Sequence, residues 1–157
     1  MTATKVSGES VKQTNRTFIK SYVEDYANAI TENYRRYHLN TLNGNLHGNY
    51  PEYAKKQLAE IENGTANLMK FKVYTGKRYY KIVQQEFETW EGSRNYGKYA
   101  DGSVHCFVDK ETGDVYKPAS WSAPAKHIRF SFQNEADLRF LLNPDNVGWA
   151  GGYLYLR

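Results

Sequence analysis

The sequence is poor in residues that build covalent or membrane-spanning structures. It holds one cysteine, Cys106, so no disulfide can form within the chain. No apolar run approaches the roughly 20 residues that a helix needs to cross a bilayer. The first residues, MTATKVSGESVKQTN, lack the apolar core of a secretory signal. These absences predict a protein that has no membrane partner and works in a reducing cytoplasm.

Catalytic and metal-binding motifs are also missing. The histidines do not stand at the close spacings that place two metal ligands on one helical turn. The acidic stretch DKETGD (109–114) lacks the length and ligand spacing of an EF-hand loop. Gly-x-Gly-x-x-Gly, Walker A and Gly-x-Ser-x-Gly patterns are absent. The sequence therefore predicts no metal, no cofactor and no identifiable catalytic residue.

What is present is typical of one soluble globular domain. The 157 residues are 40% hydrophobic and 24% charged, a composition that supports a buried core. We expect residues 1–13 to form a flexible arm and residues 14–157 to form a single domain. The sequence also holds 14 tyrosines. Because tyrosine joins an apolar ring to a polar hydroxyl, we expect most of them to be half-buried in the core.

Apolar residues recur at three- and four-residue spacing between Asn15 and Tyr37, which predicts an amphipathic helix capped by Thr14 or Asn15. This helix is expected to end before HLNTLNGNLHGNYP (38–51), which is rich in glycine and asparagine. Its inner face would be formed by Phe18, Tyr22, Tyr26, Ile30 and Tyr34, widened by Val23 and Tyr37.

Two more helices are predicted. Pro51 suits the first turn of a second helix, and Gly64 can end it in a left-handed conformation. Its expected inner side includes Tyr53, Leu58 and Ile61. Near the C-terminus, NEADLRFLLN (134–143) has the pattern of a short capped helix.

From Leu68 onward the period changes from helical to alternating, which indicates β-strands. In the first strand Met69, Phe71 and Val73 would share one side. In the strand predicted at 127–132, Ile128, Phe130 and Phe132 would share one side. Residues 91–103 are expected to form a loop. The predicted strands are 68–75, 78–90, 104–109, 114–117, 127–132 and the final GGYLYLR (151–157). Two helices followed by hairpin-linked strands predict an α+β fold, with the first helix on an antiparallel sheet.

The net charge of +4 is concentrated in the middle of the chain. Residues 68–133 carry 11 Lys and Arg against 7 Asp and Glu, and no acid occurs between residues 68 and 85. There KFKVYTGKRYYK (70–81) alternates cations with aromatic rings, a pattern suited to holding phosphates and stacking bases. An ordinary hairpin with a lysine-rich solvent face has the same pattern. The candidate nucleic-acid-binding residues are Lys70, Lys72, Tyr74, Lys77, Arg78, Tyr79 and Lys81.

The segment VHCFVDKETGDVYKPASWSAPAK (104–126) predicts a hairpin with Gly113 at positive φ and a strand ended by Pro118. ASWSAPAK (119–126) is then expected to form one helical turn, with Trp121 buried beneath it as an apolar anchor. A functional reading instead places an exposed Trp121 between two lysines that face a phosphate or a nucleotide, Lys117 and Lys126.

FVDKETGDVYKPASWSAPAK (107–126), with the final GGYLYLR, resembles small uncharacterised proteins encoded by tailed bacteriophages, including phages of marine bacteria. Those proteins share the pattern V-D-x-x-x-G-D-V-x-K-x-x-S-W-x-x-P-A-K. The resemblance implies a phage origin and synthesis in the host cytoplasm, and it brings no activity with it. The matching residues here are Val108, Asp109, Gly113, Asp114, Val115, Lys117, Ser120, Trp121, Pro124, Ala125 and Lys126.

Three functions stay open at this point. The first is a non-catalytic accessory or structural protein that binds another protein, or a second copy of itself, through aromatic surface. The second is a nucleic-acid binder that uses residues 70–81. The third is a small enzyme with a site near His105, Asp109 and Lys117. We expect the shared pattern itself to be architectural.

Overall fold

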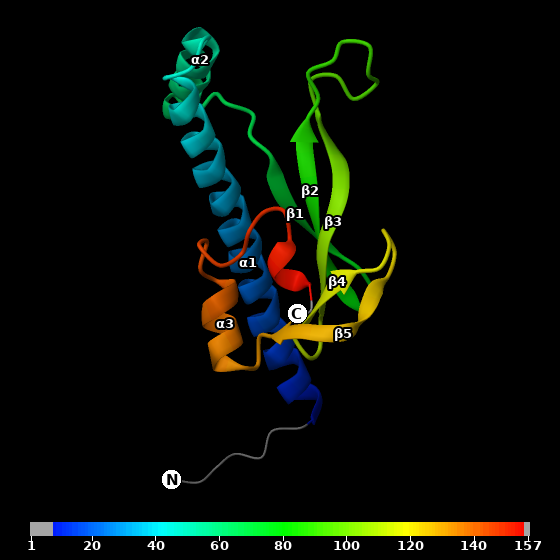
Figure 1. Cartoon of the computed structure of the whole chain (residues 1–157). Coiled ribbons are helices and arrows are strands. Elements are labelled where there is room, and N and C mark those ends of the chain that lie inside the picture. The colour runs from blue at the N-terminus through cyan, green and yellow to red at the C-terminus, as the bar shows by residue number, and fades with distance from the viewer. Residues whose placement is uncertain (1–7, 156–157) are drawn as a thin grey trace.

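Two helices form the N-terminal half of the chain. The computed structural model describes the backbone of residues 8–155 and the side chains of residues 18–155. The long α1 (Gly8–Asn45) leads to α2 (Pro51–Glu62), which crosses its C-terminal end (Figure 1). Residues 8–13 of the predicted arm are therefore helical, and residues 1–7 lie outside the described residues. The predicted cap is wrong, because Thr14 and Asn15 lie inside α1.

The prediction that α1 ends before residue 38 is also wrong, because the helix continues to Asn45. Leu42 of α1 and Ala54 of α2 are both buried, and the two helices contact each other. Burial of these side chains outweighs the low helix propensity of the asparagines at the end of α1. Each asparagine costs less than about 1 kcal/mol relative to alanine. On α2, Ala54 takes the inner position predicted for Tyr53, whose side chain is 65% exposed.

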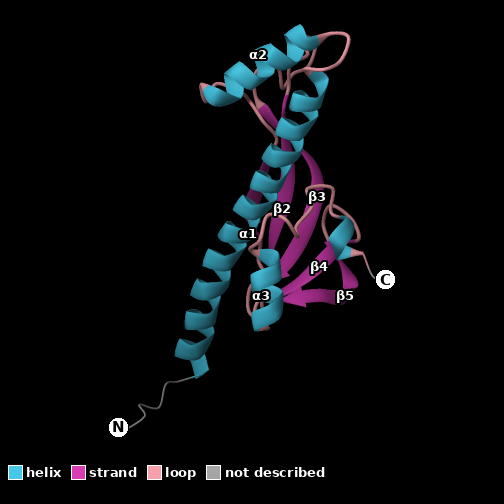
Figure 2. Cartoon of the chain, turned by 60° about the vertical axis from the view of Figure 1, so that its left-hand side comes forward, coloured by secondary structure: helices cyan, strands magenta, loops and turns pink. Residues whose placement is uncertain are grey.

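The strands form one five-stranded antiparallel sheet in which each strand pairs with the next along the chain. Figure 2 shows α1 running along the sheet, with α3 (Glu135–Leu141) beside it. The predicted α+β fold is confirmed. The strands are β1 (Lys70–Thr75), β2 (Tyr79–Phe87), β3 (Tyr99–Asp109), β4 (Asp114–Pro118) and β5 (Pro124–Ser131).

The core lies between α1 and the sheet. Val23, Tyr26 and Ile30 of α1 are completely buried, as the helical periodicity predicted. Phe18 and Tyr37, at the two ends of the predicted stripe, are instead about half exposed. The sheet contributes the buried side chains Phe71, Ile82, Cys106, Val108 and Val115.

Two strand predictions fail because cross-strand pairing extends or shifts the ladder. β3 begins at Tyr99, inside the predicted loop, because Tyr99 pairs with Phe87 and Asp101 pairs with Gln85. In β5, a register shift places Phe130 opposite Val115 but Ile128 opposite Tyr116. An extra residue in one strand reverses the side-chain alternation, so Ile128 lies on the opposite face from Phe130 and is 53% exposed.

The C-terminal segment is not a strand. Residues 152–154 form a short 3-10 helix, η1 (Gly152–Leu154), and residues 156–157 lie outside the described residues. Leu154 is buried in the core, and the Tyr153 hydroxyl lies 2.7 Å from Nε2 of His105. A tight turn delivers both side chains inward, whereas neighbouring residues of a strand would point to opposite faces.

The segment 119–126 is also not helical. Ala119 and Ser120 donate backbone hydrogen bonds to the carbonyl of Ala123, which closes a turn between β4 and β5. β4 ends at Pro118, as predicted. Trp121, at the tip of this turn, is 46% exposed, so the prediction of a buried anchor is wrong.

Gly113 closes the β3–β4 hairpin with φ of 75°, as the sequence predicted. A Cβ there would lie 3.2 Å from Cβ of Phe132 in the core. We expect Gly113→Ala to lower the free energy of unfolding by about 2 kcal/mol, because the left-handed conformation and the crowding both penalise alanine. Urea unfolding followed by circular dichroism measures this loss. Gly44→Ala is the matched control, because no atom lies within 4 Å of its Cβ. Equal stability of the two variants would contradict the prediction.

Candidate nucleic-acid interface

The face of the sheet turned away from α1 carries the predicted basic and aromatic residues. On β1, Phe71 and Val73 pack into the core, so their neighbours Lys70, Lys72 and Tyr74 project to the other side. Cross-strand pairing continues this side across the sheet from Tyr74 to Lys81 on β2 and Phe107 on β3. We call this side the open face, and its members are Lys70, Lys72, Tyr74, Tyr79, Lys81, Gln85, Asp101, Phe107 and Tyr116.

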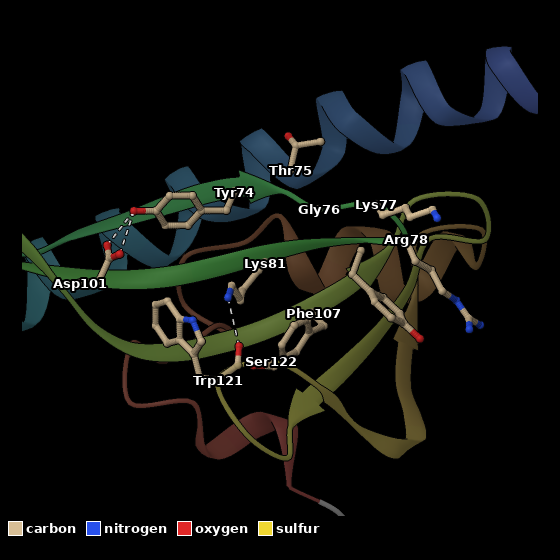
Figure 3. Close-up of a pocket in the computed structure, with 11 residues that line it drawn as sticks. Tyr74, Thr75, Gly76, Lys77, Arg78, Lys81, Asp101, Phe107, Trp121 and Ser122 are labelled. Carbon is tan, nitrogen blue, oxygen red and sulfur yellow. Dashed lines mark hydrogen bonds between the residues drawn. The ribbon is translucent and has the colours of Figure 1, made fainter.

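A groove of about 380 Å³ lies in the open face. Figure 3 shows its labelled side chains in front of the strands, whereas α1 passes behind them. Two segments that the sequence did not connect with the hairpin also line the groove: β3, through Asp101 and Phe107, and the β4–β5 turn, through Trp121. Of the seven predicted residues the groove includes Tyr74, Lys77, Arg78, Tyr79 and Lys81, while Lys70 and Lys72 lie beyond it on the same hairpin.

Lys81 and Trp121 join the two halves of the groove. The Lys81 ammonium donates a hydrogen bond to the Trp121 carbonyl at 3.0 Å and lies 4.0 Å from the centre of the indole ring (Figure 3). This contact fixes the exposed β4–β5 turn over β2. Lys81 is therefore a lysine beside Trp121 that the sequence reading, which named Lys117 and Lys126, did not include.

An aromatic cluster forms the floor of the groove. The Phe107 ring is buried, and the Tyr79 ring meets it edge-on at 5.9 Å between centroids. Tyr79 also meets Tyr116 on β4 at 6.1 Å. Such edge-to-face contacts hold the rings in fixed positions. These contacts fix the positions of Tyr79 and Phe107, the two rings of this cluster that line the groove.

Cations lie against the rings along the hairpin. The Arg78 guanidinium is 5.2 Å from the Tyr79 ring centre, and the Lys72 ammonium is 4.8 Å from that of Tyr74. Lys70 extends the series, because its ammonium lies 3.9 Å from the Tyr99 ring. These contacts orient the long side chains while their charged ends stay available to a phosphate.

Asp101 is the acidic member of the open face. Its carboxylate accepts hydrogen bonds from the Tyr74 hydroxyl at 2.8 and 3.0 Å and from the Gln85 amide at 2.8 Å. Hydrogen bonds from Gln85 and Tyr74, followed by the charges of Lys72 and Lys81, lower the pKa of Asp101. Asp101 is therefore a fixed, ionised acceptor at neutral pH.

The basic surface continues around the end of the β1–β2 hairpin. Lys77 and Arg78 line both the groove and a second, wider hollow of about 640 Å³. Lys110 adds a third cation there and donates a hydrogen bond to the Gly76 carbonyl at 3.1 Å. Asp109 and Glu111 line the same hollow, so its lining combines three cations with two acids.

Asp109 and Asp114 of the shared pattern have structural surroundings. Asp109 is buried, accepts hydrogen bonds from the backbone amides of Glu111 and Thr112, and pairs with Arg78 at 3.5 Å. Asp114 accepts a hydrogen bond from the Thr112 hydroxyl. Both acids thus hold the β3–β4 hairpin.

Five further residues of the segment 107–126 lie in or near the β4–β5 turn: Lys117, Ser120, Trp121, Pro124 and Lys126. Ser120 accepts a hydrogen bond from the Ser122 amide within the turn, and Pro124 begins β5. The Lys117 ammonium lies 4.1 Å from the Tyr155 ring, and Lys126 is exposed on β5. Trp121 is the pattern residue that lines the groove.

The three residues of the enzyme hypothesis do not share one cavity. His105 and Lys117 line a hollow of about 250 Å³, and Asp109 lies instead at the 640 Å³ hollow. The His105 ring is buried, with Nε2 at 2.7 Å from the Tyr153 hydroxyl, and that hydroxyl in turn contacts the hydroxyl of Tyr26. Burial lowers the pKa of His105 to about 4 and raises that of the Cys106 thiol to about 12. At neutral pH both are therefore uncharged members of the core.

Sequence reasoning did not name Asp101, and it did not connect Trp121 with the hairpin 70–81. Trp121 carried a signal, because a proline-bounded turn with a tryptophan next to lysines stood out. Asp101 carried none, since it lay in a glycine-rich stretch that was expected to be a loop. Asp101 and Trp121 stand 20 and 40 positions from Lys81 in the sequence, and they line one groove with it only because the strands and the β4–β5 turn bring these segments together.

Two further observations concern ligands and membranes. Among the residues that the structure describes, no three His, Cys, Asp or Glu side chains are grouped as a metal site. None of the helices in residues 8–155 combines the length and the apolar character needed to cross a bilayer.

Comparison with known proteins gives one family and no further relative. No curated protein and no solved structure matches the chain. A family described as "Family of unknown function (DUF7717)" matches residues 5–156. Since the match spans nearly the whole sequence, the chain belongs to the DUF7717 family.

Proposed function

We propose that the open face of the sheet binds single-stranded nucleic acid. The observation that carries this proposal is the groove in which Lys81 and Trp121 meet the basic and aromatic residues of the β1–β2 hairpin. Five cations lie between Lys70 and Lys81, a stretch that contains no acid, so a phosphate backbone would meet several positive charges along this part of the hairpin.

The rings of the groove suit bases that are not paired. Trp121 and Tyr74 stand at its walls, and the exposed part of the indole offers a surface on which a base can stack. A base in a duplex has both faces covered by its neighbours, whereas a base in a single strand can leave the stack. The combination of a cation track with fixed rings therefore favours single strands over a duplex.

Replacing Lys70, Lys72, Lys77 and Arg78 together by alanine is expected to weaken binding of a fluorescent single-stranded oligonucleotide by at least about 30-fold at 50 mM salt. Each lost phosphate contact also removes about 0.7 from the slope of log K against log salt, so the slope should fall by up to about 3. Fluorescence anisotropy over a salt series measures both quantities. All four side chains are exposed, and Asp109, which loses its ion pair with Arg78, keeps its two backbone hydrogen bonds, so the fold should be retained, as circular dichroism would verify.

The matched control replaces Lys20, Lys55, Lys56 and Arg94, which are exposed on α1, α2 and the β2–β3 loop. It removes the same four charges and should bind within about threefold of the original protein. Equal affinity of both quadruple variants would contradict the proposal, as would the absence of binding by the original protein at low salt.

The second candidate is a role as an accessory or structural protein that acts through protein contacts. Four exposed aromatic side chains favour it: Tyr50 and Tyr53 beside α2, and Trp90 and Tyr96 in the β2–β3 loop. Figure 1 places α2 and this loop at the same end of the molecule. With the resemblance to phage proteins, this surface would serve a partner, or a second copy of the chain, in the cytoplasm of an infected host.

Light scattering tests the self-association form of this second candidate. A mass of one chain at high concentration, together with no specific capture of a protein from infected cells, would contradict it. Loss of an observed complex on Trp90→Ser with Tyr53→Ser, both exposed positions, would support it.

A further inference from the structure

Asp101 places a negative charge in a surface that is otherwise suited to phosphate. It is exposed on β3, and its carboxylate is held by Tyr74 from β1 and Gln85 from β2. Neither bond serves the core, because all three residues belong to the open face. A carboxylate that lines the groove and is held by two neighbours on the same face is positioned to meet a ligand there.

The Asp101 carboxylate has few hydrogen-bond acceptor positions left for a ligand, and they point in one direction. The Tyr74 hydroxyl approaches both carboxylate oxygens, and the Gln85 amide takes a second place on Oδ1. Each carboxylate oxygen can accept about two hydrogen bonds, so the remaining acceptor position lies mainly on Oδ2. It can accept one hydrogen bond from a donor, and it repels any group that presents only oxygen acceptors.

Among nucleic-acid bases this chemistry separates two classes. Cytosine presents an amino group at the position where thymine and uracil present a carbonyl oxygen, and Asp is a known partner of the cytosine amino group. In Figure 3, Asp101 and Trp121 lie on the same side of Lys81, so a base stacked on the indole can direct its edge toward the carboxylate.

We propose that Asp101 is a specificity-determining residue that selects bases with an exocyclic amino group, cytosine in particular, over thymine and uracil. This inference rests on the proposed binding of single strands by the open face. Tyr74 and Gln85 act through Asp101 as positioning residues, because their hydrogen bonds fix the direction of its free lone pair.

The test compares labelled oligo-dC and oligo-dT of equal length at pH 7.5 by fluorescence anisotropy. Oligo-dC should bind about 3- to 10-fold more tightly than oligo-dT. The cytosine amino group gains a hydrogen bond to Asp101, whereas the thymine oxygen at the same position is repelled by the carboxylate. Asp101→Asn should strengthen binding of oligo-dT, because it removes the repulsion and adds an amide donor for the thymine oxygen. The ratio of the two affinities should then fall to about one.

Two further variants make the result specific. Tyr74→Phe keeps the ring and the charge of the groove but releases the carboxylate, so it should reduce the preference without raising the affinity for oligo-dT. Asp25→Asn is the matched control, because it changes an exposed acid on α1 to its amide and should leave the ratio unchanged. Thermal unfolding of each variant confirms that the fold is retained.

The outcomes separate this inference from the proposed function. Equal binding of both oligonucleotides, with Asp101→Asn strengthening both alike, would overturn the role of Asp101 and leave single-strand binding intact. Failure of the original protein to bind either oligonucleotide at low salt would overturn both proposals. A preference for oligo-dC that survives Asp101→Asn would assign the selection to another residue.

Discussion

Lowering the pH from 7 to 4 is expected to remove about 3 kcal/mol from the free energy of unfolding through His105 alone. The ring is buried beside Phe71 and Tyr153, and burial lowers its pKa from 6.5 to about 4. The unfolded chain therefore binds a proton at a higher pH than the folded chain does. The stability that the neutral ring allows is fully present above pH 6.5 and is lost as the pH falls toward 4. Lowering the pKa of His105 from 6.5 to about 4 corresponds to about 3 kcal/mol.

His105→Gln tests this prediction, since glutamine removes the titrating ring. The variant will be less stable than the original protein at pH 7, but the difference between them should shrink by about 3 kcal/mol at pH 4. Urea unfolding at several pH values measures the trend. The control is His127→Gln, an exposed position on β5, which should keep the acid sensitivity of the original protein. Parallel pH curves for the original protein and His105→Gln would show that the prediction is wrong.

Ile30→Ala is expected to destabilise the protein by 2–5 kcal/mol, roughly the range for removing a large aliphatic side chain from a packed core. Ile30 has no exposed surface and belongs to the face of α1 that packs on the sheet. Because a domain of this size is stable by only about 5–15 kcal/mol, this single change removes a large part of the total.

Ile128→Ala is the matched control for this loss. It makes the same chemical change on β5, where the side chain is 53% exposed on the open face. Its cost should stay below about 1 kcal/mol, and denaturant midpoints of the two variants give the comparison. Similar losses at both positions would contradict the assignment of the core to the α1 side of the sheet.

The candidate site was only partly predictable. Alternation along β1 predicted that Lys70, Lys72 and Tyr74 share one side, and the structure confirms this placement. The alternation could not indicate which distant residues would join them. Trp121 was expected to be buried because isolated tryptophans usually are, yet the β4–β5 turn holds it at the surface against Lys81.

Errors at the ends of elements have one common cause. Local composition predicted that α1 stops before residue 38, that β3 begins after residue 103 and that the C-terminus is a strand. In each case a distant contact prevails: Leu42 is buried where α1 meets α2, Tyr99 pairs with Phe87, and Tyr153 reaches His105. Contacts of this kind contribute more free energy than the local preferences they override.

Local patterns were enough to predict the α+β class, the inner face of α1 around Tyr26 and Ile30, and the hairpin that Gly113 closes. These features depend on period and on backbone conformation, and both act over a few neighbouring residues. The assembly of Asp101, Trp121 and Lys81 in one groove became visible only in the folded chain. Hydrogen bonding between β2 and β3 brings Asp101 to this face, and the bond from Lys81 to the Trp121 carbonyl holds the β4–β5 turn against it, and no local pattern encodes either alignment.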